Sequence, residues 1–333
     1  MKTIEERQDY FKRMASKGSQ TPYWPDIDRA FQVIITANNE EEHLLECLES
    51  VELAMRNEKW VMHFGDDGST DKTLSIVNNF KNKSSAQEFH IYQFDKAENV
   101  AKAKNRTIEK SIKYSKEFPA ILLHDADDKM ALGRAKGLHK HAVDRGGEDS
   151  SYIYLGDYVY CIYEQNKQDK INALVSYSKL SWGPWATMIH SEFIPENGEL
   201  FYEGVSVHED MVLWNEIITA GVSVTTVEGL NTCYYNAREG TLSKNLDVKK
   251  RKAIWRDHKI FLKDNNIEVP IEKNFQDPFL NNPLKAMSFD LPQGYEIEDT
   301  TGKEKTEKEL KRSTNKILQK GTDEFMKELG ESS

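Results

Sequence analysis

Short apolar runs alternate with amphipathic segments over the first third of the chain. Four of these runs, at 31–35, 60–64, 90–94 and 120–124, predict β-strands. The segments between them carry apolar residues at helical spacing and predict helices. Strands that alternate with helices are typical of a mostly parallel sheet with right-handed crossovers. We therefore expect an α/β fold whose ligands bind beyond the carboxyl ends of the strands.

The loops after the first two predicted strands carry helix-start signals. Asn39 and Glu42 have the spacing of a capping box, so we expect Asn39 to cap the helix that carries Leu44, Leu45, Leu48 and Val51. Gly68 fits a turn, and the Ser-Thr-Asp run at 69–71 fits the cap of the next helix. Local structure therefore explains part of both loops before any chemistry is considered.

Beyond residue 150 the pattern is less regular. Apolar residues predict strands at 152–163 and 223–227, and a helix at 209–221 that ends at Gly221. A basic helix is expected from residue 247 onward. The final segment mixes Lys and Glu at helical spacing, which predicts a solvated helix or a frayed tail.

These patterns divide the chain into three expected parts. Residues 1–30 are predicted to form an N-terminal helical extension, because a short amphipathic helix is followed by Gly and Pro. Residues 31–245 are predicted to form the α/β domain. Residues 246–333 are predicted to form a C-terminal helical extension or tail.

Composition narrows the class of protein. The chain has 333 residues, of which 38% are hydrophobic, and a formal net charge of −10. The acidic balance disfavours a duplex-binding protein, which neutralises phosphates with basic side chains. Three widely spaced cysteines argue against a zinc ribbon or a disulfide framework. The first residues are charged and no apolar run is long enough for a bilayer, so we expect a soluble, cytoplasmic protein.

Acidic residues gather at the ends of two predicted strands. Asp66 and Asp67 follow the second strand, and Asp125, Asp127 and Asp128 follow the fourth. Because ligands bind at this edge of a parallel sheet, we expect the two groups to share a site. Carboxylate oxygens suit hard divalent cations, which can bridge the phosphates of a nucleotide. A D-x-D pattern alone is a weak signal, and the apolar strand before it strengthens the interpretation.

Four segments taken together resemble glycosyltransferase family 2, the inverting enzymes of the GT-A fold. They read IITANNEE at 34–41, DDGSTD at 66–71, DADD at 125–128 and HED at 208–210. The resemblance covers about residues 31–245. It implies a GT-A-type, Rossmann-like sheet flanked by helices. It also implies transfer of a sugar from a nucleotide-sugar donor, expected to be a UDP-sugar, to an acceptor hydroxyl with the help of Mn²⁺ or Mg²⁺.

The resemblance assigns roles to the two acidic segments. Asp125 would orient the ribose or a metal-bound water and help to hold the metal, and Asp127 would ligate the metal. Ala126 lies between them in the nucleotide-sugar-binding segment. Either Asp66 or Asp67 would read the base, and the choice between them stays open.

Two further segments are expected to touch the nucleotide. In the first loop, Thr36, Asn38 and Glu40 would frame the base, although the Pro and the aromatic residue usual in the family are both replaced. In the segment 99–108, Lys104 stands where the family usually has Arg, and the resemblance places it near the nucleotide. A solvated helical lysine is the alternative explanation for Lys104.

The general base is expected at the start of the helix at 209–221. By resemblance Asp210 deprotonates the acceptor hydroxyl, Glu209 supports it, and His208 lies on the acceptor side. General-base assistance is worth roughly 10²–10⁴-fold in rate. Two acidic residues at a helix start also stabilise the helix dipole, which is the structural alternative.

The remaining expected contacts involve aromatic and phosphate-binding residues. In the segment SWGPW, Trp182, Gly183 and Trp185 would cover the sugar and acceptor, while two tryptophans around Gly-Pro could equally be core residues. In the segment NAREGTLS, Arg238 would pair with a phosphate and Ser243 would donate to it. The His metal ligand that this segment often carries in the family is missing.

Several alternatives remain. A nucleotidyltransferase would need a Gly-rich loop where ANNEEEH stands, and a catalytically inactive nucleotide-sugar-binding scaffold would keep the fold without turnover. The acceptor can be a glycan, a lipid-linked sugar, a protein side chain or a modified base of a nucleic acid. The basic helix at 249–259 keeps the nucleic-acid acceptor open. The terminal extensions are candidates for self-association into a homo-oligomer or for acceptor docking.

Overall fold

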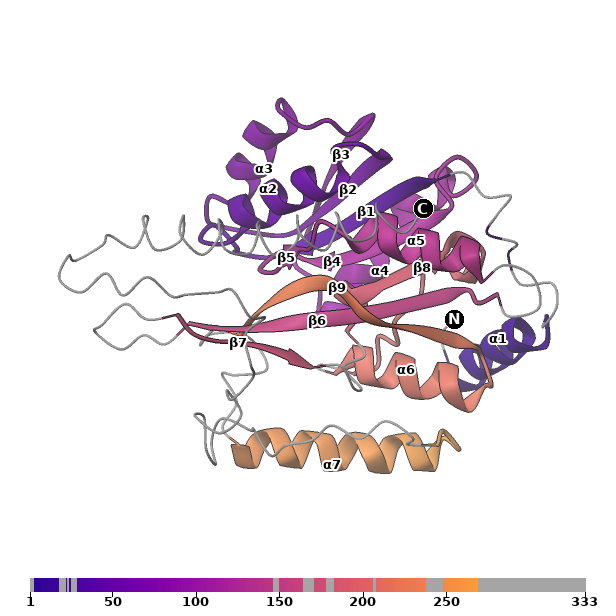
Figure 1. The fold of residues 1–333 in the computed structure, drawn as a ribbon. Helices are drawn as coiled ribbons and strands as arrows, with labels where there is room; N and C mark the ends of the chain where they lie inside the picture. The colour runs from indigo at the N-terminus through magenta and orange to yellow at the C-terminus, as the bar shows by residue number, and fades with distance from the viewer. Residues whose placement is uncertain are drawn as a thin grey trace.

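One sheet organises the molecule (Figure 1). The computed structural model describes residues 3–17, 22, 24, 29–145, 150–163, 171–177, 183–205, 208–237 and 248–268. Within this part of the chain, nine strands pair in the order β3-β2-β1-β4-β8-β6-β9-β5, and β7 pairs with β6. Helices cover both faces, so the expected α/β class is confirmed.

The first part of the sheet is entirely parallel, as predicted. Strand β1 pairs with β2 and β4, and β2 pairs with β3. The four strands are β1 (Ala30–Ala37), β2 (Lys59–Asp67), β3 (Glu88–Phe94) and β4 (Ala120–Asp125). The helices of this part are α2 (Leu44–Met55), α3 (Thr73–Lys81), α4 (Val100–Ser111), η3 (Ile112–Tyr114) and α5 (Arg134–Asp144).

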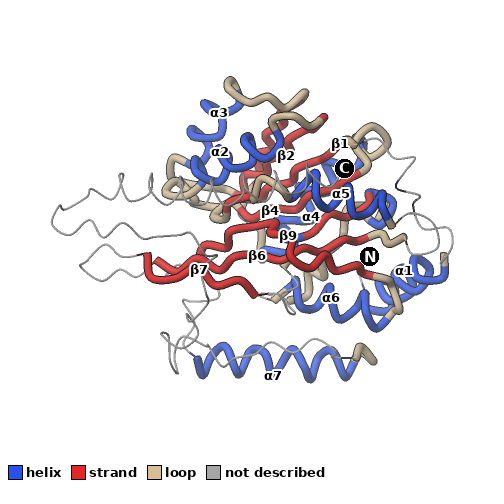
Figure 2. Tube along the Cα trace, viewed as in Figure 1, coloured by secondary structure: helices blue, strands red, loops and turns tan. Residues whose placement is uncertain are grey.

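The second part of the sheet is mixed, and Figure 2 shows its strands in red below those of the first part. β6 pairs antiparallel with β7 and β8 and parallel with β9, and β8 joins this group to β4. The strands are β5 (Lys129–Met130), β6 (Ile153–Tyr163), β7 (Ile171–Tyr177), β8 (Thr187–His190) and β9 (Val224–Ala237), with short helices η4 (Pro184–Ala186) and η5 (Ser191–Phe193). The strand predicted at 223–227 is thus the start of a longer strand.

Alternation along β1 divides the interior into two cores. Phe31, Val33 and Ile35 face helices α2, α3 and α5, whereas Ile34 faces the opposite side with α4. On β4, Leu122 belongs to the first core. Successive side chains of a strand point to opposite faces, so each strand end also divides its polar residues between the two sides.

Both terminal helices pack against the helix that follows residue 208, and the N-terminal one also joins the second core. Helix α1 (Ile4–Ser16) contributes Phe11, which lies in the same core cluster as Trp214 of α6 (Glu209–Thr219). Helix α7 (Val248–Asp264) contributes Leu262, which clusters with Val212 of α6. The division into three parts stays a prediction, and the expected tail beyond 268 lies outside the described residues.

The predicted capping box after β1 is wrong. Helix α2 begins after His43, whose side chain does not cap it. Asn39 adopts a left-handed backbone conformation, with φ of 57°, and its Oδ1 accepts a hydrogen bond from Thr70 N at 2.8 Å. The asparagine side chain is used to join two loops, so it is not available to the helix.

Within the described residues, no helix has the length and apolar character needed to cross a membrane.

Candidate active site

The loops after β1 and β2 interlock through their side chains and backbone amides. Asn38 Nδ2 donates to the Asp67 carbonyl at 2.8 Å, and Glu40 N donates to Thr73 Oγ1 at 2.7 Å. Gly68, with φ of +71°, turns the second loop, and a Cβ there would lie 2.8 Å from Lys96 N. Two short loops therefore form one rigid rim at the carboxyl end of the sheet.

Strand parity brings three predicted site residues to the face covered by α4. Thr36 follows the register of Ile34, and its Oγ1 donates to Thr107 Oγ1 of α4 at 2.9 Å. Asp125 of β4 and Asp67 of β2 also meet side chains of α4. Thr36, Asp67 and Asp125 consequently lie on the same face of the sheet, against α4.

The two aspartates of β2 lie in different surroundings. Asp67 Oδ1 accepts from Arg106 Nη2 of α4 at 2.5 Å and from Ala97 N at 2.9 Å, and Lys96 Nζ lies 3.2 Å from its Oδ2. Asp66 points to the other side of the strand, where its Oδ2 accepts from Ser69 N at 3.3 Å. Asp67 is therefore the one of the pair beside the α4 face.

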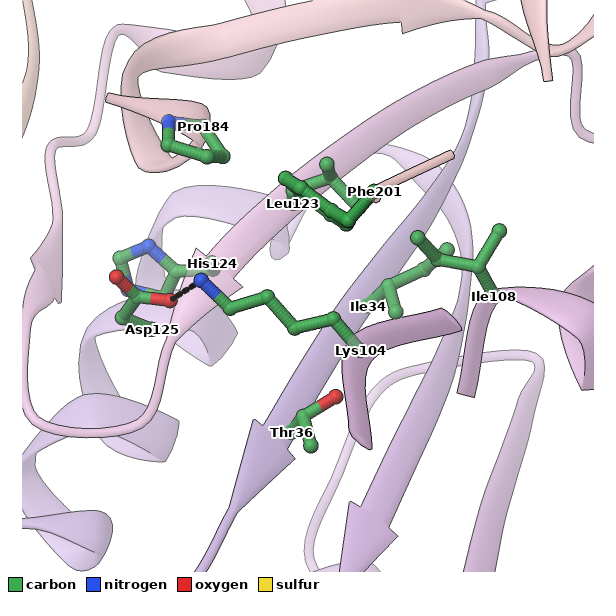
Figure 3. A pocket seen from close by; sticks show the side chains of 9 residues that line it. All are labelled: Ile34, Thr36, Lys104, Ile108, Leu123, His124, Asp125, Pro184 and Phe201. Atoms are coloured by element: carbon green, nitrogen blue, oxygen red, sulfur yellow. Dashed lines mark ion pairs between the residues drawn. The ribbon is translucent and has the colours of Figure 1, made fainter. Parts of the chain in front are cut away.

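Lys104 joins two segments that are distant in the sequence, and Figure 3 shows its ion pair with the first of them, at Asp125. Its Nζ lies 3.2 Å from Asp125 Oδ1 of β4 and 3.1 Å from Glu209 Oε1 of α6. Burial alone would lower the pKa of Lys104, but the carboxylates of Asp125, Glu209 and Asp210 outweigh it and raise the pKa above its usual value. The ammonium group is thus held charged between the strand end and the helix start.

A pocket opens beside this lysine. Its walls come from β1, α4, β4, the turn before β8 and the segment before α6, and Figure 3 shows Lys104 extending across it toward Asp125. The lining residues are Ile34, Thr36, Lys104, Ile108, Leu123, His124, Asp125, Pro184 and Phe201. Apolar walls with a few charged groups at one end are the usual composition of a ligand site.

The D-A-D-D segment at 125–128 begins with Asp125, which ends β4 and lines the pocket. Ala126 is buried in the first core and anchors the turn. Burial raises the pKa of the Cys47 thiol, and the negative charges of Asp128, Asp127 and Asp125 raise it further, in that order. The negative charge of this segment therefore disfavours the thiolate of Cys47. No group of three or more potential metal ligands among His, Cys, Asp and Glu occurs in the described part of the chain.

Helix α6 begins with the expected acidic pair at the edge of the site. His208, the residue before the helix, has φ of 63° and is buried. A left-handed conformation at a non-glycine residue is uncommon and often marks a functional position. Asp210 lies in the first turn, where its Oδ1 accepts from Met211 N at 2.8 Å. Glu209 thus meets Asp125 across Lys104, and the negative charge of Asp210 also acts on that lysine.

The segment before β8 is fixed by a buried arginine. Arg134 Nη2 donates to the carbonyls of Leu123 and Thr187, each at 2.7 Å, and so ties β4 to the first residue of β8. Within the turn before β8, Trp185 stacks on Tyr235 of β9, with ring centroids 5.2 Å apart. Gly183 lets this ring approach, because a Cβ there would lie 2.3 Å from it.

Some expected site residues lie outside the described part of the chain, namely Trp182, Arg238 and Ser243. Their roles stay predictions. Conversely, sequence reasoning missed Arg106 and Arg134. Arg106 follows Lys104 by two residues in the segment that resembled the family, so a closer reading of that helix would have offered it as a candidate. No sequence pattern indicated Arg134, because its partners are backbone carbonyls, which any residue can supply.

Comparison with known proteins gives a family and a fold. Residues 32–183 match the model described as glycosyl transferase family 2. The comparison with curated proteins gives no match. The S. aureus TarS fragment 1–349 in complex with UDP-GlcNAc is 17% identical, covers 78% of this chain and 73% of its own, and has a TM-score of 0.52.

Two other solved structures lie below a TM-score of 0.5. The TarS fragment 1–349 alone is 17% identical, covers 72% of this chain and 67% of its own, and has a TM-score of 0.49. Mannosyltransferase PcManGT from Pyrobaculum calidifontis, in complex with GDP-Man and Mn²⁺, is 13% identical, covers 85% and 76%, and has a TM-score of 0.47. The structural similarity to the TarS complex with UDP-GlcNAc establishes the fold, and the expected GT-A-type sheet is confirmed.

Proposed function

Because residues 32–183 of this chain match glycosyltransferase family 2, we propose that it is an inverting, metal-assisted enzyme that uses a UDP-sugar. In this proposal the sugar passes from the nucleotide-sugar donor to an acceptor hydroxyl in one in-line displacement. The observation that carries the proposal is the Lys104 bridge between Asp125 and Glu209. It supports a single site that holds donor-side and acceptor-side carboxylates together.

We assign recognition of the base to Asp67 and Arg106. The edge of uracil presents one imide N–H between two carbonyl oxygens, so it needs an acceptor beside a donor. The Asp67 carboxylate and the Arg106 guanidinium lie side by side at 2.5 Å and supply that pair. Asp66 lies on the other face of β2 with Ser69, which favours a structural role for it.

We propose that the diphosphate of the donor binds at the D-A-D-D segment, residues 125–128. Asp127, with Asp125, would hold Mn²⁺ or Mg²⁺, and oxygen ligands of this kind suit either ion. A site with few protein carboxylates fits a cation that takes its remaining ligands from phosphates and water, as Mg²⁺ sites commonly do. When bound, the ion supplies charge stabilisation for the departing nucleoside diphosphate.

We assign the general base to Asp210. Its carboxylate, in the first turn of α6, accepts the proton of the acceptor hydroxyl as that oxygen attacks the anomeric carbon from the face opposite the diphosphate. Glu209, paired with Lys104 at 3.1 Å, fixes the helix start beside the donor. Holding both reactants in line supplies much of the rate, since orientation is worth as much as several powers of ten.

The acceptor proposed here is a saccharide. Trp185, stacked on Tyr235, provides a large aromatic surface in the turn next to Pro184 of the pocket. Aromatic faces pack well against the C–H faces of sugar rings. Gly183 and His208 would border the same side.

Thermal stability with a panel of nucleotide sugars tests the donor assignment. A ligand at 100 times its Kd stabilises the folded state by about 2.7 kcal/mol, so the true donor raises Tm in the presence of Mn²⁺. We expect a UDP-sugar to give the largest shift, and we expect release of UDP when a saccharide acceptor is added. A panel in which GDP-sugars alone raise Tm overturns the base assignment, and binding without any turnover favours an inactive scaffold.

A further inference from the structure

Helix α1, which precedes the family-matched segment, is inserted into the half of the molecule that carries the proposed base. We call residues 30–145 the donor half, and we call residues 150–237 together with α1 the base half. Figure 1 shows α1 beside α6, and the two helices are in direct contact. Phe11 and Met14 lie in one buried cluster with Trp214 and Ile217 of α6.

Arg7 of α1 is fully buried and bonded on every side. Its Nε and Nη2 donate to the two carboxylate oxygens of Glu216, at 2.8 and 2.6 Å. Its Nη1 donates to the Glu199 carbonyl at 3.1 Å, and its Nη2 also donates to the Leu200 carbonyl at 2.9 Å. A two-point guanidinium–carboxylate pair fixes direction as well as distance. Arg7 therefore fixes two segments at once.

The first of these segments is α6 itself. Glu216 is seven residues after Glu209, which is about two turns on a helix of 3.6 residues per turn. The two glutamates consequently lie near the same side of the helix. One is held by Arg7 and the other by Lys104. The rotation of α6 about its axis and its position along that axis are thereby set by two cations, Lys104 near its start and Arg7 near its end.

The second segment leads into the pocket. Phe201, which follows the two carbonyls held by Arg7, lines the pocket. Its N and O atoms are both bonded to the Asn105 side chain, at 2.9 and 2.8 Å. Asn105 is the neighbour of Lys104 on α4. A short chain of contacts thus connects Arg7 with the lysine that joins the two halves.

We infer that Arg7 is a positioning residue, which orients α6 and the segment 199–201 so that Asp210 faces the donor. The inference rests on the proposed role of Asp210. Arg7 touches neither donor nor acceptor, and it acts through Glu216 and two carbonyls. The alternative is a purely structural ion pair that contributes to folding and leaves the active-site geometry unchanged.

Three variants of the full chain separate these roles. Arg7→Met removes the cation. The double change Arg7→Met with Glu216→Met replaces both buried charges by apolar groups of similar length, a replacement that often keeps or raises stability. Arg13→Met is the matched control, because Arg13 is an exposed residue of the same helix that lies over the Tyr10 ring.

The first readout is amide hydrogen exchange, which needs neither donor nor acceptor. We expect faster exchange at 199–201 and in the first turn of α6 in both Arg7 variants, with exchange in β1–β4 unchanged. Arg13→Met should exchange as the wild type does. Unchanged exchange at these segments in the folded double variant overturns the inference, whatever the enzyme's substrate proves to be.

The second readout is turnover of the donor sugar nucleotide. We expect kcat to fall by about tenfold or more in the double variant, because a small misplacement of a catalytic group is costly, while donor KM and UDP affinity change by less than about threefold. A folded double variant with wild-type kcat overturns the inference. If the wild type itself turns over no nucleotide sugar, the proposed function fails while the exchange result still decides the role of Arg7.

Discussion

The donor half and the base half hold their carboxylates in different ways. In the donor half, partners from the same half do so: the Asp67 carboxylate accepts from Ala97 N and pairs with Arg106, and short loops interlock beside it. In the base half, the helix that carries Asp210 depends on side chains from other parts of the chain. Lys104 is 105 residues from Glu209, and Arg7 is 209 residues from Glu216.

This difference predicts that donor binding and sugar transfer differ in their tolerance of amino-acid substitutions. The rim of the donor half is built from backbone amides and loop side chains within the family-matched segment. The base half contains a buried ion pair, Arg7 with Glu216, and both residues lie outside that segment. Removing one member of a buried pair leaves an uncompensated charge and is strongly destabilising. We therefore expect donor binding and transfer to respond separately to substitution.

The largest effect is expected from Asp210→Asn. The amide keeps the shape of the side chain but accepts no proton, so turnover should fall about 10²–10⁴-fold while nucleotide affinity is unchanged. Steady-state kinetics and calorimetry with UDP and Mn²⁺ measure the two quantities. Asp257→Asn, on an exposed aspartate of α7, is the control. Wild-type turnover would refute the base assignment, and lost UDP affinity would show that the halves are not separate.

Asp127→Ala probes the donor half in the same way. We expect Mn²⁺-dependent UDP affinity to fall at least about tenfold, because interactions of charged groups are worth about 1.5–3 kcal/mol. Amide exchange in α6 should stay at the wild-type rate. Asp144→Ala, at an exposed ion pair with Lys140, is the control. An affinity that is equal with and without Mn²⁺ in the wild type contradicts the metal assignment.

Lys104→Met cuts the link between the halves. Two carboxylates then lose their shared cation, and we expect the free energy of unfolding to fall by about 1–3 kcal/mol together with a loss of turnover. Lys102→Met is matched to it, since Lys102 pairs with the exposed Glu98 one turn away and should cost less than about 0.5 kcal/mol. Chemical denaturation compares the two. Equal losses would mean that the bridge has no special importance.

Acidification should lower the free energy of unfolding, through one buried histidine in each half. Burial lowers the pKa of His63, in the donor half, to about 3, with His90 and Lys113 adding to the effect. Burial alone lowers the pKa of His190, in the base half, to about 4. Because the unfolded histidines take up protons below about pH 6.5 while the folded ones stay neutral, stability is complete above that pH and is lost as the pH falls. Each histidine should cost about 1.5 kcal/mol between about pH 6.5 and pH 5.

Urea denaturation at the two pH values checks this. The variant His190→Gln should lose about 1.5 kcal/mol less on acidification than the wild type does. Equal pH dependence in the two proteins would contradict the assignment of a neutral, buried His190. A single transition at both pH values indicates that the two halves unfold together.

Much of the donor half could be predicted from the sequence. Strand periodicity located β1–β4, and the acidic residues after β2 and β4 pointed to one edge of the sheet. The spacing of the family segments also identified the start of α6. Each of these features lies within a short stretch of sequence, so it can be recognised without knowledge of the fold.

Side-chain partners were harder to predict. Asn39 has the spacing of a helix cap, yet its side chain bonds Thr70 in the next loop. Lys104 has the pattern of a solvated helical lysine, yet it is held between Asp125 and Glu209. A hydrogen-bonding group takes the partner that the packed chain brings to it, and local spacing does not contain that information.

By itself, the sequence determined the order of strands and helices and the strand ends at which carboxylates stand, because both follow from periodicity along the chain. The tertiary structure alone decided that Asp67, and not Asp66, faces α4, and that Arg7 bonds Glu216. Those outcomes depend on segments that are far apart in the chain and meet only when the sheet and its helices pack, and buried charges are stable only where that packing supplies a partner.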